Sequence, residues 1–420
     1  MLRIAAGQAA RPTEEYLRFA AQLGLTSVQF NTPDLPGDKR WEVEDLVALR
    51  KRCESFGLVL EAIENIPVAF YLNSMLGRPG RDEEIEHVRA TIANIGKAEI
   101  PVLGYCFMPQ SVWRTSLTPT GRGGAVVSGF DAAVAADPSR RNEVLVARRD
   151  LRVEDAKDSW TAGSHIVSDV SVSEEQMWDN YAYFMAGIIP AAEEAGIRLA
   201  LHPDDPPVPE LDGVGRLFRS VEALRRAAKI ASSPAWGLDL CLGTVSEMGG
   251  EAAVFDAIDF FGPRNEIVYV HLRDVHGHGD SFVECFLGEG NYDPVAVLER
   301  LIDVGFDGFL LDDHTPLLVN DSPYGHRGRA HAIGYMQGVL DVLGRGGGDG
   351  AKAPRAQRSS VASSLDAPVG AGAAERLAGT RPRRVAAVPA GSGAQLRALR
   401  NATSKVTSSM VSPASVSGAK

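Results

Sequence analysis

Short apolar runs alternate with segments in which apolar residues recur at helical spacing. Eight of the runs predict strands: Leu2–Ala6, Ser27–Phe30, Val59–Ile63, Val102–Phe107, Gly196–Leu201, Trp236–Cys241, Ile267–His271 and Gly308–His314. A short, continuous apolar run bounded by polar turns is typical of a strand that is buried on both faces. The pattern therefore indicates a parallel sheet that is covered on both sides.

The segments between these runs predict helices. They cover Thr13–Leu23, Glu42–Phe56, Asp82–Ala98, a helix from about Ser173, Leu217–Ala228, Ala252–Phe261, Pro294–Val304 and, after the last strand, about Gly328–Leu343. Strands that alternate with helices form parallel α/β sheets, and eight such units close into a barrel. We therefore predict an α/β fold, a (β/α)8 TIM barrel, with a catalytic domain spanning residues 1–343.

One connection is too long for an ordinary barrel loop. About 65 residues (108–172) separate the fourth strand from the next helix, whereas such loops typically have about 2–6 residues. Because this connection lies on the face formed by the carboxyl ends of the strands, we predict that it is a lid. Its arginines Arg114 and Arg122 lie near flexible glycines, and we expect them to bind an anionic substrate. A solvated loop with incidental arginines is the alternative.

The last part of the chain, residues 344–420, has a different composition. It contains no Phe, Tyr or Trp and is rich in Gly, Ala, Ser and Arg. With so little large apolar surface it cannot offset the entropy of ordering. We predict a disordered basic tail, either a dispensable extension or a segment that docks on a partner.

Charge and composition narrow the function classes. The net charge is −11, and the tail carries 12 Lys+Arg against 3 Asp+Glu, so residues 1–343 carry −20. A surface this acidic disfavours nucleic acid, since phosphate contacts supply most non-specific affinity. The chain has no run of about 18 apolar residues, and because the apolar stretch in residues 1–7 is short we expect no signal peptide. The four cysteines lack paired spacing, as in a reduced compartment. We expect a cytoplasmic protein without membrane contact, and self-association remains open.

Potential metal ligands end four successive strands. They are His202, Cys241, His271 and Asp313, separated by 39, 30 and 42 residues, about one βα unit each. Each is weak evidence alone, because a single buried cysteine is usually an apolar filler. In a barrel, however, the strand ends converge on one mouth. The set predicts a metal site, for which ligand softness favours Zn²⁺ or Fe²⁺ over Mn²⁺.

Other polar residues adjoin these predicted ligands. Asp205 is a candidate partner of His202 or of substrate, although either Asp204 or Asp205 equally suits binding the next helix's N-terminus. Arg273 lies two residues beyond His271 and suits bidentate binding of a carboxylate. A metal, arginines and a His/Tyr pair fit removal of a proton next to a carboxylate.

These residues make the sequence resemble the mannonate dehydratase family. The matching words are Phe107-Met108-Pro109, Trp113-Arg114-Thr115, His202-Pro203-Asp204-Asp205-Pro206-Pro207, Cys241-Leu242-Gly243-Thr244, Phe261-Gly262-Pro263-Arg264, His271-Leu272-Arg273, Phe282 with Glu284, Asp313-His314, and Tyr324 with Gly328-Arg329. They span about residues 102–340.

The resemblance implies a barrel related to xylose isomerase and the dehydration of D-mannonate to 2-dehydro-3-deoxy-D-gluconate in glucuronate catabolism. It implies Mn²⁺, with Fe²⁺ and Zn²⁺ as alternatives, bound by the four strand-end ligands. It also implies that His314 and Tyr324 are the acid/base pair, in an unassigned order. The sugar acid is then the small-molecule partner.

The chain departs from the family pattern in two strands and in the connection from Asp313 to Tyr324, which is short. Its first strand, Leu2-Arg3-Ile4-Ala5-Ala6, lacks the aromatic residues typical of the family. The eighth strand ends Asp312-Asp313-His314-Thr315-Pro316, where the family has a proline before Asp-His and a glycine after it. These departures concern the identity of the substrate, and a related sugar acid remains an alternative to D-mannonate.

Three other functions compete with a dehydratase. A sugar isomerase or epimerase on the same barrel would move a proton without loss of water, but such enzymes build their metal sites mainly from carboxylates, unlike Cys241. A metal-dependent endonuclease is disfavoured by the charge of −20. A non-catalytic sugar-acid-binding protein would bind the same ligand without turnover.

Overall fold

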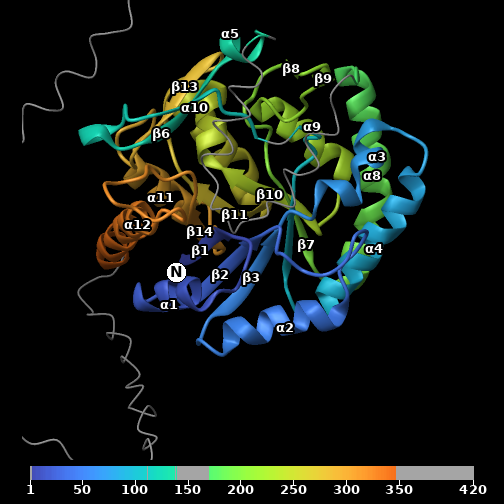
Figure 1. Ribbon diagram of the computed structural model, residues 1–420, viewed down its shortest axis with the longest axis horizontal. Coiled ribbons are helices and arrows are strands. Elements are labelled where there is room, and N and C mark those ends of the chain that lie inside the picture. The colour runs from blue at the N-terminus through green and yellow to red at the C-terminus, as the bar shows by residue number, and fades with distance from the viewer. Residues whose placement is uncertain (1, 111, 138, 140–169, 347–420) are drawn as a thin grey trace, which may run out of the picture. The chain divides into compact units, whose positions relative to one another are not determined.

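Eight parallel strands form a closed barrel, which confirms the predicted fold class (Figure 1). The structure is a computed structural model that describes residues 2–110, 112–137, 139 and 170–346. The order around the barrel is β1-β14-β11-β10-β7-β4-β3-β2. The strands are β1 (Arg3–Ala9), β2 (Ser27–Asn31), β3 (Val59–Glu64), β4 (Val102–Tyr105), β7 (Arg198–Leu201), β10 (Trp236–Cys241), β11 (Ile267–Leu272) and β14 (Phe309–Asp312).

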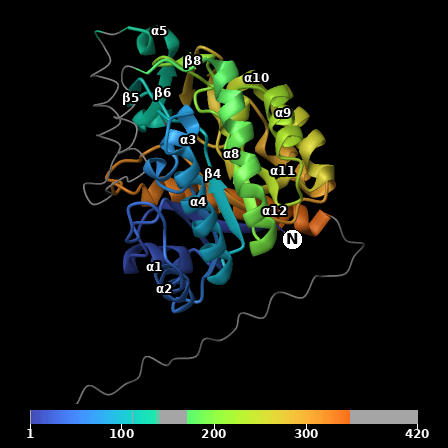
Figure 2. The same cartoon turned by 90° about the vertical axis from the view of Figure 1, so that its right-hand side faces the viewer.

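Helices surround the barrel, as Figures 1 and 2 show from two sides. They are α1 (Glu14–Gln22), α2 (Val43–Glu54), α3 (Leu72–Leu76), α4 (Arg81–Lys97), α8 (Glu174–Ala195), α9 (Val221–Ala231), α10 (Leu242–Phe261), α11 (Pro294–Asp303) and α12 (His326–Gly346), with short 3-10 turns η1 (Val68–Phe70), η2 (Arg122–Gly124) and η5 (Gly262–Arg264). The side chains of Thr13, Ser173 and Ser220 cap α1, α8 and α9 by accepting from backbone N–H groups of the first turn.

Two helices start four or more residues away from the predicted start. Helix α9 begins four residues later than expected, because the carboxylate of Asp204 accepts hydrogen bonds from the backbone N–H groups of Leu217 and Phe218 and holds them in the loop. Helix α10 begins directly after β10. Non-helical backbone at Gly249 and Gly250 divides it, and the apolar pattern predicted only the half that follows this break.

A second sheet stands above the barrel and was not predicted. It is antiparallel, with the order β12-β13-β6-β5, where β5 is Ser116–Thr118, β6 is Val127–Asp131, β12 is Val275–His278 and β13 is Ser281–Glu284. Phe130 of β6 stacks on Phe282 of β13 at 5.6 Å between ring centroids. The sheet thus joins the predicted insertion, 108–172, to the loop that follows β11.

In the part that the structure describes, one further short element belongs to the insertion and another pairs with its last residue. Helix α5 (Ala132–Ala135) follows β6, and both lie beside β5 at the same end of the molecule in Figure 2. The hairpin β8 (Glu210–Leu211) and β9 (Val214–Gly215) follows β7 and includes the bridge partner of Val172. Residues 140–169 lie outside the described part, so the predicted lid remains a prediction.

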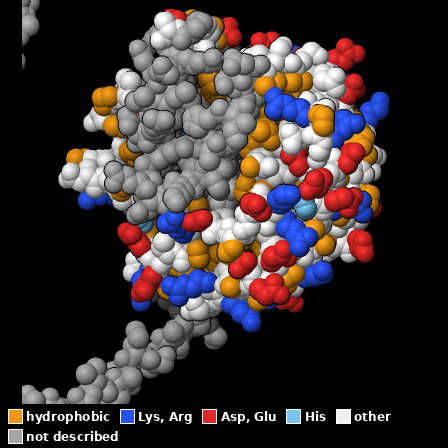
Figure 3. Space-filling view, turned by 45° about the vertical axis from the view of Figure 1, so that its right-hand side comes forward, with side chains coloured by type: hydrophobic (Ala, Val, Ile, Leu, Met, Phe, Trp, Pro, Cys, Tyr) orange, Lys and Arg blue, Asp and Glu red, His pale blue; other side chains and the backbone are white. Residues whose placement is uncertain are grey.

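The structure describes only the first three residues of the predicted tail. Residues 344–346 end α12, and the rest of the predicted tail, 347–420, lies outside the described residues. None of the helices described here has the length and hydropathy needed to cross a membrane. Acidic and basic side chains are interspersed over the face of the barrel shown in Figure 3.

Candidate metal and active site

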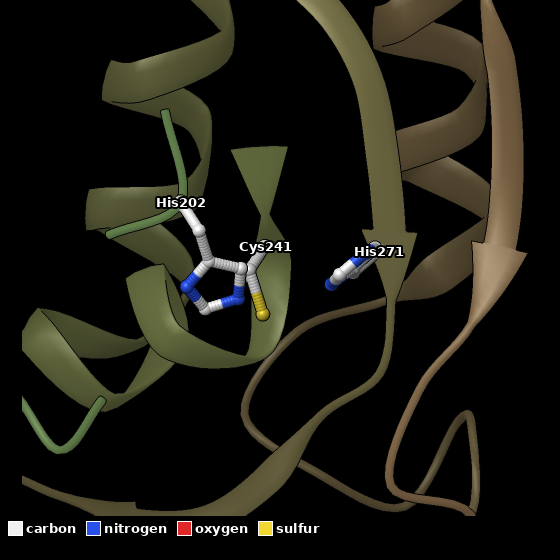
Figure 4. Close-up of side chains that lie close together, drawn as sticks. All are labelled: His202, Cys241 and His271. Carbon is white, nitrogen blue, oxygen red and sulfur yellow. The ribbon is translucent and has the colours of Figure 1, made fainter. Parts of the chain in front are cut away.

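Three of the four predicted metal ligands meet at the mouth of the barrel. His202 directly follows β7, Cys241 ends β10 and His271 lies near the end of β11. One ligand atom from each lies within 4.8 Å of the other two, and all three side chains are buried. Figure 4 shows them converging from three segments. Strand register explains this, because Cys241 and His271 are direct partners across β10 and β11.

Asp313 reaches the same place from β14. It follows Asp312, which pairs with Leu272 of β11. Its Oδ2 lies 3.8 Å from Nδ1 of His271. The four residues predicted from their strand-end positions are therefore neighbours in space.

The hydrogen bonds of the two histidines fit a metal at this place. Nδ1 of His202 donates to the backbone carbonyl of Pro203 at 2.6 Å, so Nε2 is the ring nitrogen available to a metal. Nε2 of His271 donates to Glu64 at 3.1 Å, and its buried Nδ1 has no hydrogen-bond partner among the described residues. Histidines that bind metals typically donate their other ring N–H to a carbonyl or a carboxylate in this way. The donor set therefore fits a divalent transition metal.

Electrostatics favour a thiolate at Cys241. Burial alone would raise the pKa of this thiol, but the positive charges of Arg273 and His202 and a hydrogen bond from His202 lower it well below its usual value. The effect is mutual: although burial opposes it, Cys241 raises the pKa of His202 to about 10. Since the thiolate is the form that binds metals, the site presents a ligand ready for a cation.

A buried network of ion pairs lies beside these ligands. Arg273 contacts four carboxylates, with Nη2 2.6 Å from Asp205, Nη1 2.8 Å from Glu247 and 3.3 Å from Glu284, and Nε 3.0 Å from Asp313. All of these side chains are buried. Buried charges persist only when they are paired and hydrogen-bonded, and each of these four carboxylates pairs with the guanidinium group of Arg273.

The network includes Arg114, Arg273 and Asp205, which the sequence predicts to bind substrate. Arg114 bridges Asp205 and Glu284, with Nη2 2.8 Å and 2.6 Å from their oxygens. Asp205 lines the mouth cavity, but both of its oxygens accept from guanidinium groups. In the structure these three residues bind one another and hold the loops after β4, β7 and β11 together, and their contact with substrate stays a prediction.

His314 lies at the border between this network and the cavity. Its side chain is 31% exposed, whereas Glu284 beside it is 2% exposed. Nδ1 of His314 lies 3.0 Å from Oε1 of Glu284 and 3.1 Å from Nη2 of Arg114. Its backbone φ is +43°, a conformation that costs energy in a residue other than glycine and is typical of functional sites.

Two predicted residues are not brought to the cavity. The hydroxyl of Tyr324 donates to the carbonyl of Gly7 at 2.7 Å, and its ring packs in an aromatic cluster with Tyr16, Phe19 and His326. Arg122 is 58% exposed and pairs with Glu289 at 2.6 Å. Both have local partners that the sequence does not reveal, and neither is among the described residues that line the cavity.

The cavity also has a side that the sequence analysis missed. It is lined by the ligands His202, His271 and Asp313, by Asp205 and His314, and by residues of the first four strand ends and the loop after β4: Gln8, Asn31, Glu64, Asn65, Cys106, Met108 and Val112. The strand-end rule that found the metal ligands also applies to Gln8, Asn31 and Glu64, which lie at the ends of β1, β2 and β3.

A parallel barrel with a metal-type ligand cluster and an accessible histidine at its mouth defines a TIM-barrel enzyme, since active sites of this fold lie at the carboxyl ends of the strands. Within that class, the chain belongs to the D-mannonate dehydratase (UxuA) family, whose model matches residues 14–347. Membership makes it a hydro-lyase of that family.

Similar proteins cover most of the described chain. A mannonate dehydratase of Streptococcus equi subsp. zooepidemicus is 30% identical over 334 residues, which is 77% of this chain and 90% of that protein. One from Thermotoga neapolitana is 29% identical over 330 residues, 74% and 89% of the two chains. The crystal structure of mannonate dehydratase from Streptococcus suis serotype 2 is similar with a TM-score of 0.68 and 28% identity, over 84% of this chain and 99% of that one.

Proposed function

We propose that this enzyme catalyses the metal-dependent dehydration of D-mannonate to 2-dehydro-3-deoxy-D-gluconate and water, in the cytoplasm. The observation that carries the proposal is the shared cavity that His202, His271 and Asp313 line together with the half-exposed His314. A cation-binding cluster next to a histidine that can exchange protons fits elimination next to a carboxylate. The relatives named above supply the identity of the substrate.

In this proposal four residues hold Mn²⁺, with Fe²⁺ and Zn²⁺ as alternatives: His202, Cys241, His271 and Asp313. Their arrangement supports the assignment, because three ligand atoms lie within 4.8 Å of one another and Asp313 adjoins His271. When bound, the metal supplies electrostatic stabilisation of the negative charge that develops next to the substrate carboxylate.

His314 is the proposed proton-transfer residue. Oε1 of Glu284 can only accept a hydrogen bond and Nη2 of Arg114 can only donate one, and both reach Nδ1. These two contacts therefore fix the orientation of the ring. His314 then moves a proton at C2 or at the departing C3 hydroxyl of the substrate.

A panel of aldonic acids tests the reaction. Purified protein with Mn²⁺ is incubated with each acid, and the 2-keto-3-deoxy product is measured. We expect this product from D-mannonate. An isomerase or epimerase would give an isomer without loss of water, and a sugar-acid-binding protein would give binding without product.

The His314→Asn variant tests the proton-transfer role. We expect kcat to fall by about 10²- to 10⁴-fold, the usual contribution of a general acid or base, with unchanged metal content. His278→Asn is the matched control, because His278 is exposed on β12 and does not line the cavity. Near-normal turnover of the His314 variant with metal bound would contradict the assignment.

The role predicted for Tyr324 has a separate test. As the second acid/base group, its hydroxyl would have to leave the carbonyl of Gly7 when substrate binds. If it does so, Tyr324→Phe lowers kcat by at least tenfold at unchanged metal content. If Tyr324 only packs, the variant loses one hydrogen bond, a stability loss of about 1 kcal/mol, and keeps its kcat.

A further inference from the structure

The mouth cavity has two chemically different sides. The side formed by the loops after β7, β11 and β14 carries the imidazoles and carboxylates of the proposed metal site. The opposite side carries the carboxamides Gln8, Asn31 and Asn65, which we call the amide wall. Among the described lining residues there is no Lys or Arg. Only the metal side therefore suits the carboxylate of a substrate.

Hydrogen bonds hold the amide wall in place. Nδ2 of Asn31 donates to Oε1 of Gln8 at 2.9 Å and to Oε1 of Glu64 at 3.1 Å. Nε2 of Gln8 donates to the other oxygen of Glu64 at 3.3 Å. Since Glu64 also accepts from His271, the wall is connected to the metal side through one carboxylate.

The backbone at the wall is unusual for its residue types. Gln8 has a φ of +62° and Asn65 a φ of +63°. Such left-handed conformations cost energy outside glycine and persist where the surrounding structure fixes them. The strand ends therefore present these carboxamides in one defined direction.

One hydrogen-bonding atom of the wall has no partner. Oδ1 of Asn65 is buried and accepts no hydrogen bond from any described residue, although Asn65 is only 5% exposed and lines the cavity. Its Nδ2 makes one long contact, 3.5 Å, with Asn31. A buried acceptor without a donor is costly, so a donor from a ligand in the cavity would relieve that cost.

We infer that the amide wall binds the hydroxyl groups of the substrate carbon chain beyond C3, with Oδ1 of Asn65 accepting from one of them. A carboxamide carries a donor and an acceptor, as a hydroxyl does, and has no charge that would attract a second carboxylate. The inference rests on the proposed function and deepens it: the enzyme selects a long polyhydroxy acid over a short one. Asn65 is then a specificity-determining residue.

The test compares two acids that each carry a carboxylate with hydroxyls at C2 and C3 but differ in the length of the carbon chain. D-Mannonate carries hydroxyls beyond C3, whereas D-glycerate ends at C3. Binding of each to the Mn²⁺-loaded protein is measured by calorimetry for the wild type and for Asn65→Gly, which removes the carboxamide and suits a φ of +63°. We expect the Kd of D-mannonate to rise about tenfold and that of D-glycerate to stay within about twofold.

Asn265→Gly is the matched control. Asn265 is exposed after η5, has a φ of +56° and does not line the cavity, so the change should alter neither Kd. Gln8→Gly is a second test variant, because Gln8 is the other residue of the amide wall with a left-handed backbone conformation. We expect the same selective loss of affinity for D-mannonate.

The possible results distinguish a failure of the amide wall from a failure of the proposed function. Equal loss for both acids, or no loss for either, would overturn the inference, as would a wild type that binds D-mannonate no more tightly than D-glycerate. Selective binding without formation of the 2-keto-3-deoxy product would instead refute the proposed function and leave the amide wall as a polyol-binding site.

Discussion

Asp205 shows how much of this site depends on single charges. Its carboxylate is fully buried and accepts from both Arg114 and Arg273. Removing one partner of a buried ion pair leaves an uncompensated charge, which typically costs about 3–5 kcal/mol. We expect Asp205→Asn to lower the free energy of unfolding by this amount in chemical denaturation.

Asp256→Asn is the control for that measurement. Asp256 pairs with Arg225 at 2.6 Å, but its side chain is 51% exposed. Exposed pairs contribute roughly 0.2–1 kcal/mol, so the loss should be small. Similar losses for the two variants would show that the Asp205 network contributes no more than a surface pair.

The same carboxylate predicts how stability depends on pH. Burial alone would raise the pKa of Asp205, but the guanidinium groups of Arg114 and Arg273 lower it well below its usual value. A lowered folded-state pKa stabilises the protein above the unfolded pKa of about 3.9, and this contribution is lost as the pH falls through the lower folded value. The difference in unfolding free energy between wild type and Asp205→Asn should therefore be constant near neutral pH and shrink below about pH 4.

Cys241 predicts the consequence of removing a ligand. Serine is a poorer metal ligand than a thiolate, so Cys241→Ser should weaken binding of Mn²⁺ or Zn²⁺ by at least tenfold. Metal that binds only the folded state adds about 2.7 kcal/mol at 100 times its Kd, and about half or more of the resulting rise in Tm should disappear in this variant. Cys285→Ser is the control, since Cys285 is buried outside the cluster and donates to a carbonyl. A rise in Tm equal to that of the wild type would contradict the ligand assignment.

At the scale of residues, the sequence predicts positions better than partners. His202, Cys241, His271 and Asp313 could be found because a barrel brings all strand ends to one mouth. It could not be predicted that Arg114 and Arg273 bind carboxylates of the protein, because such pairing joins residues up to 170 positions apart. The same holds for Tyr324, whose hydroxyl donates to the carbonyl of Gly7, a residue 317 positions earlier in the sequence.

Among the elements, α10 contains a break that depends on one residue. Gly250 has φ +65° and ψ −151° inside the helix, a region essentially limited to glycine, with a cost of about 1–3 kcal/mol for other residues. A Cβ there would meet only Asn291, at 4.0 Å. Gly250→Ala should therefore lower the free energy of unfolding through backbone strain alone.

Gly338 provides the opposite case. It lies inside α12, and a Cβ there would meet nothing within 4 Å. Because alanine favours helices by about 1 kcal/mol over glycine, Gly338→Ala should raise the stability slightly. Both variants are measured by denaturant titration. A lower free energy of unfolding for Gly338→Ala, or an unchanged one for Gly250→Ala, would contradict these two predictions.

Elements that depend on contacts between nearby residues could be predicted from the sequence, and those that depend on contacts between distant segments could not. The eight barrel strands and most helices could be predicted from local periodicity, because each buries its own apolar residues. The sheet β12-β13-β6-β5 could not, since Phe130 and Phe282 belong to segments about 150 positions apart. The first half of α10 was missed because no polar cap separates it from β10.

For the whole molecule, we expect the barrel to fold and act without residues 347–420. The family model ends at residue 347, and the tail is poor in large apolar residues. A chain ending at Gly346 should keep its kcat, metal content and Tm. A chain ending at Gly325 should fail to fold, because it loses α12, in which Ala332, Ile333 and Met336 are buried. Loss of metal or activity in the longer chain would show that the tail has a role at the site.

The pairing of β6 with β13 also bears on how such barrels can be recombined. Deleting residues 116–131 would leave β13 with a free edge, and exposed strand edges readily pair with other chains. Glu284, which contacts His314, ends that strand. Grafting this mouth onto another scaffold would therefore require transplanting both loops as one unit, since either alone would produce an aggregation-prone host.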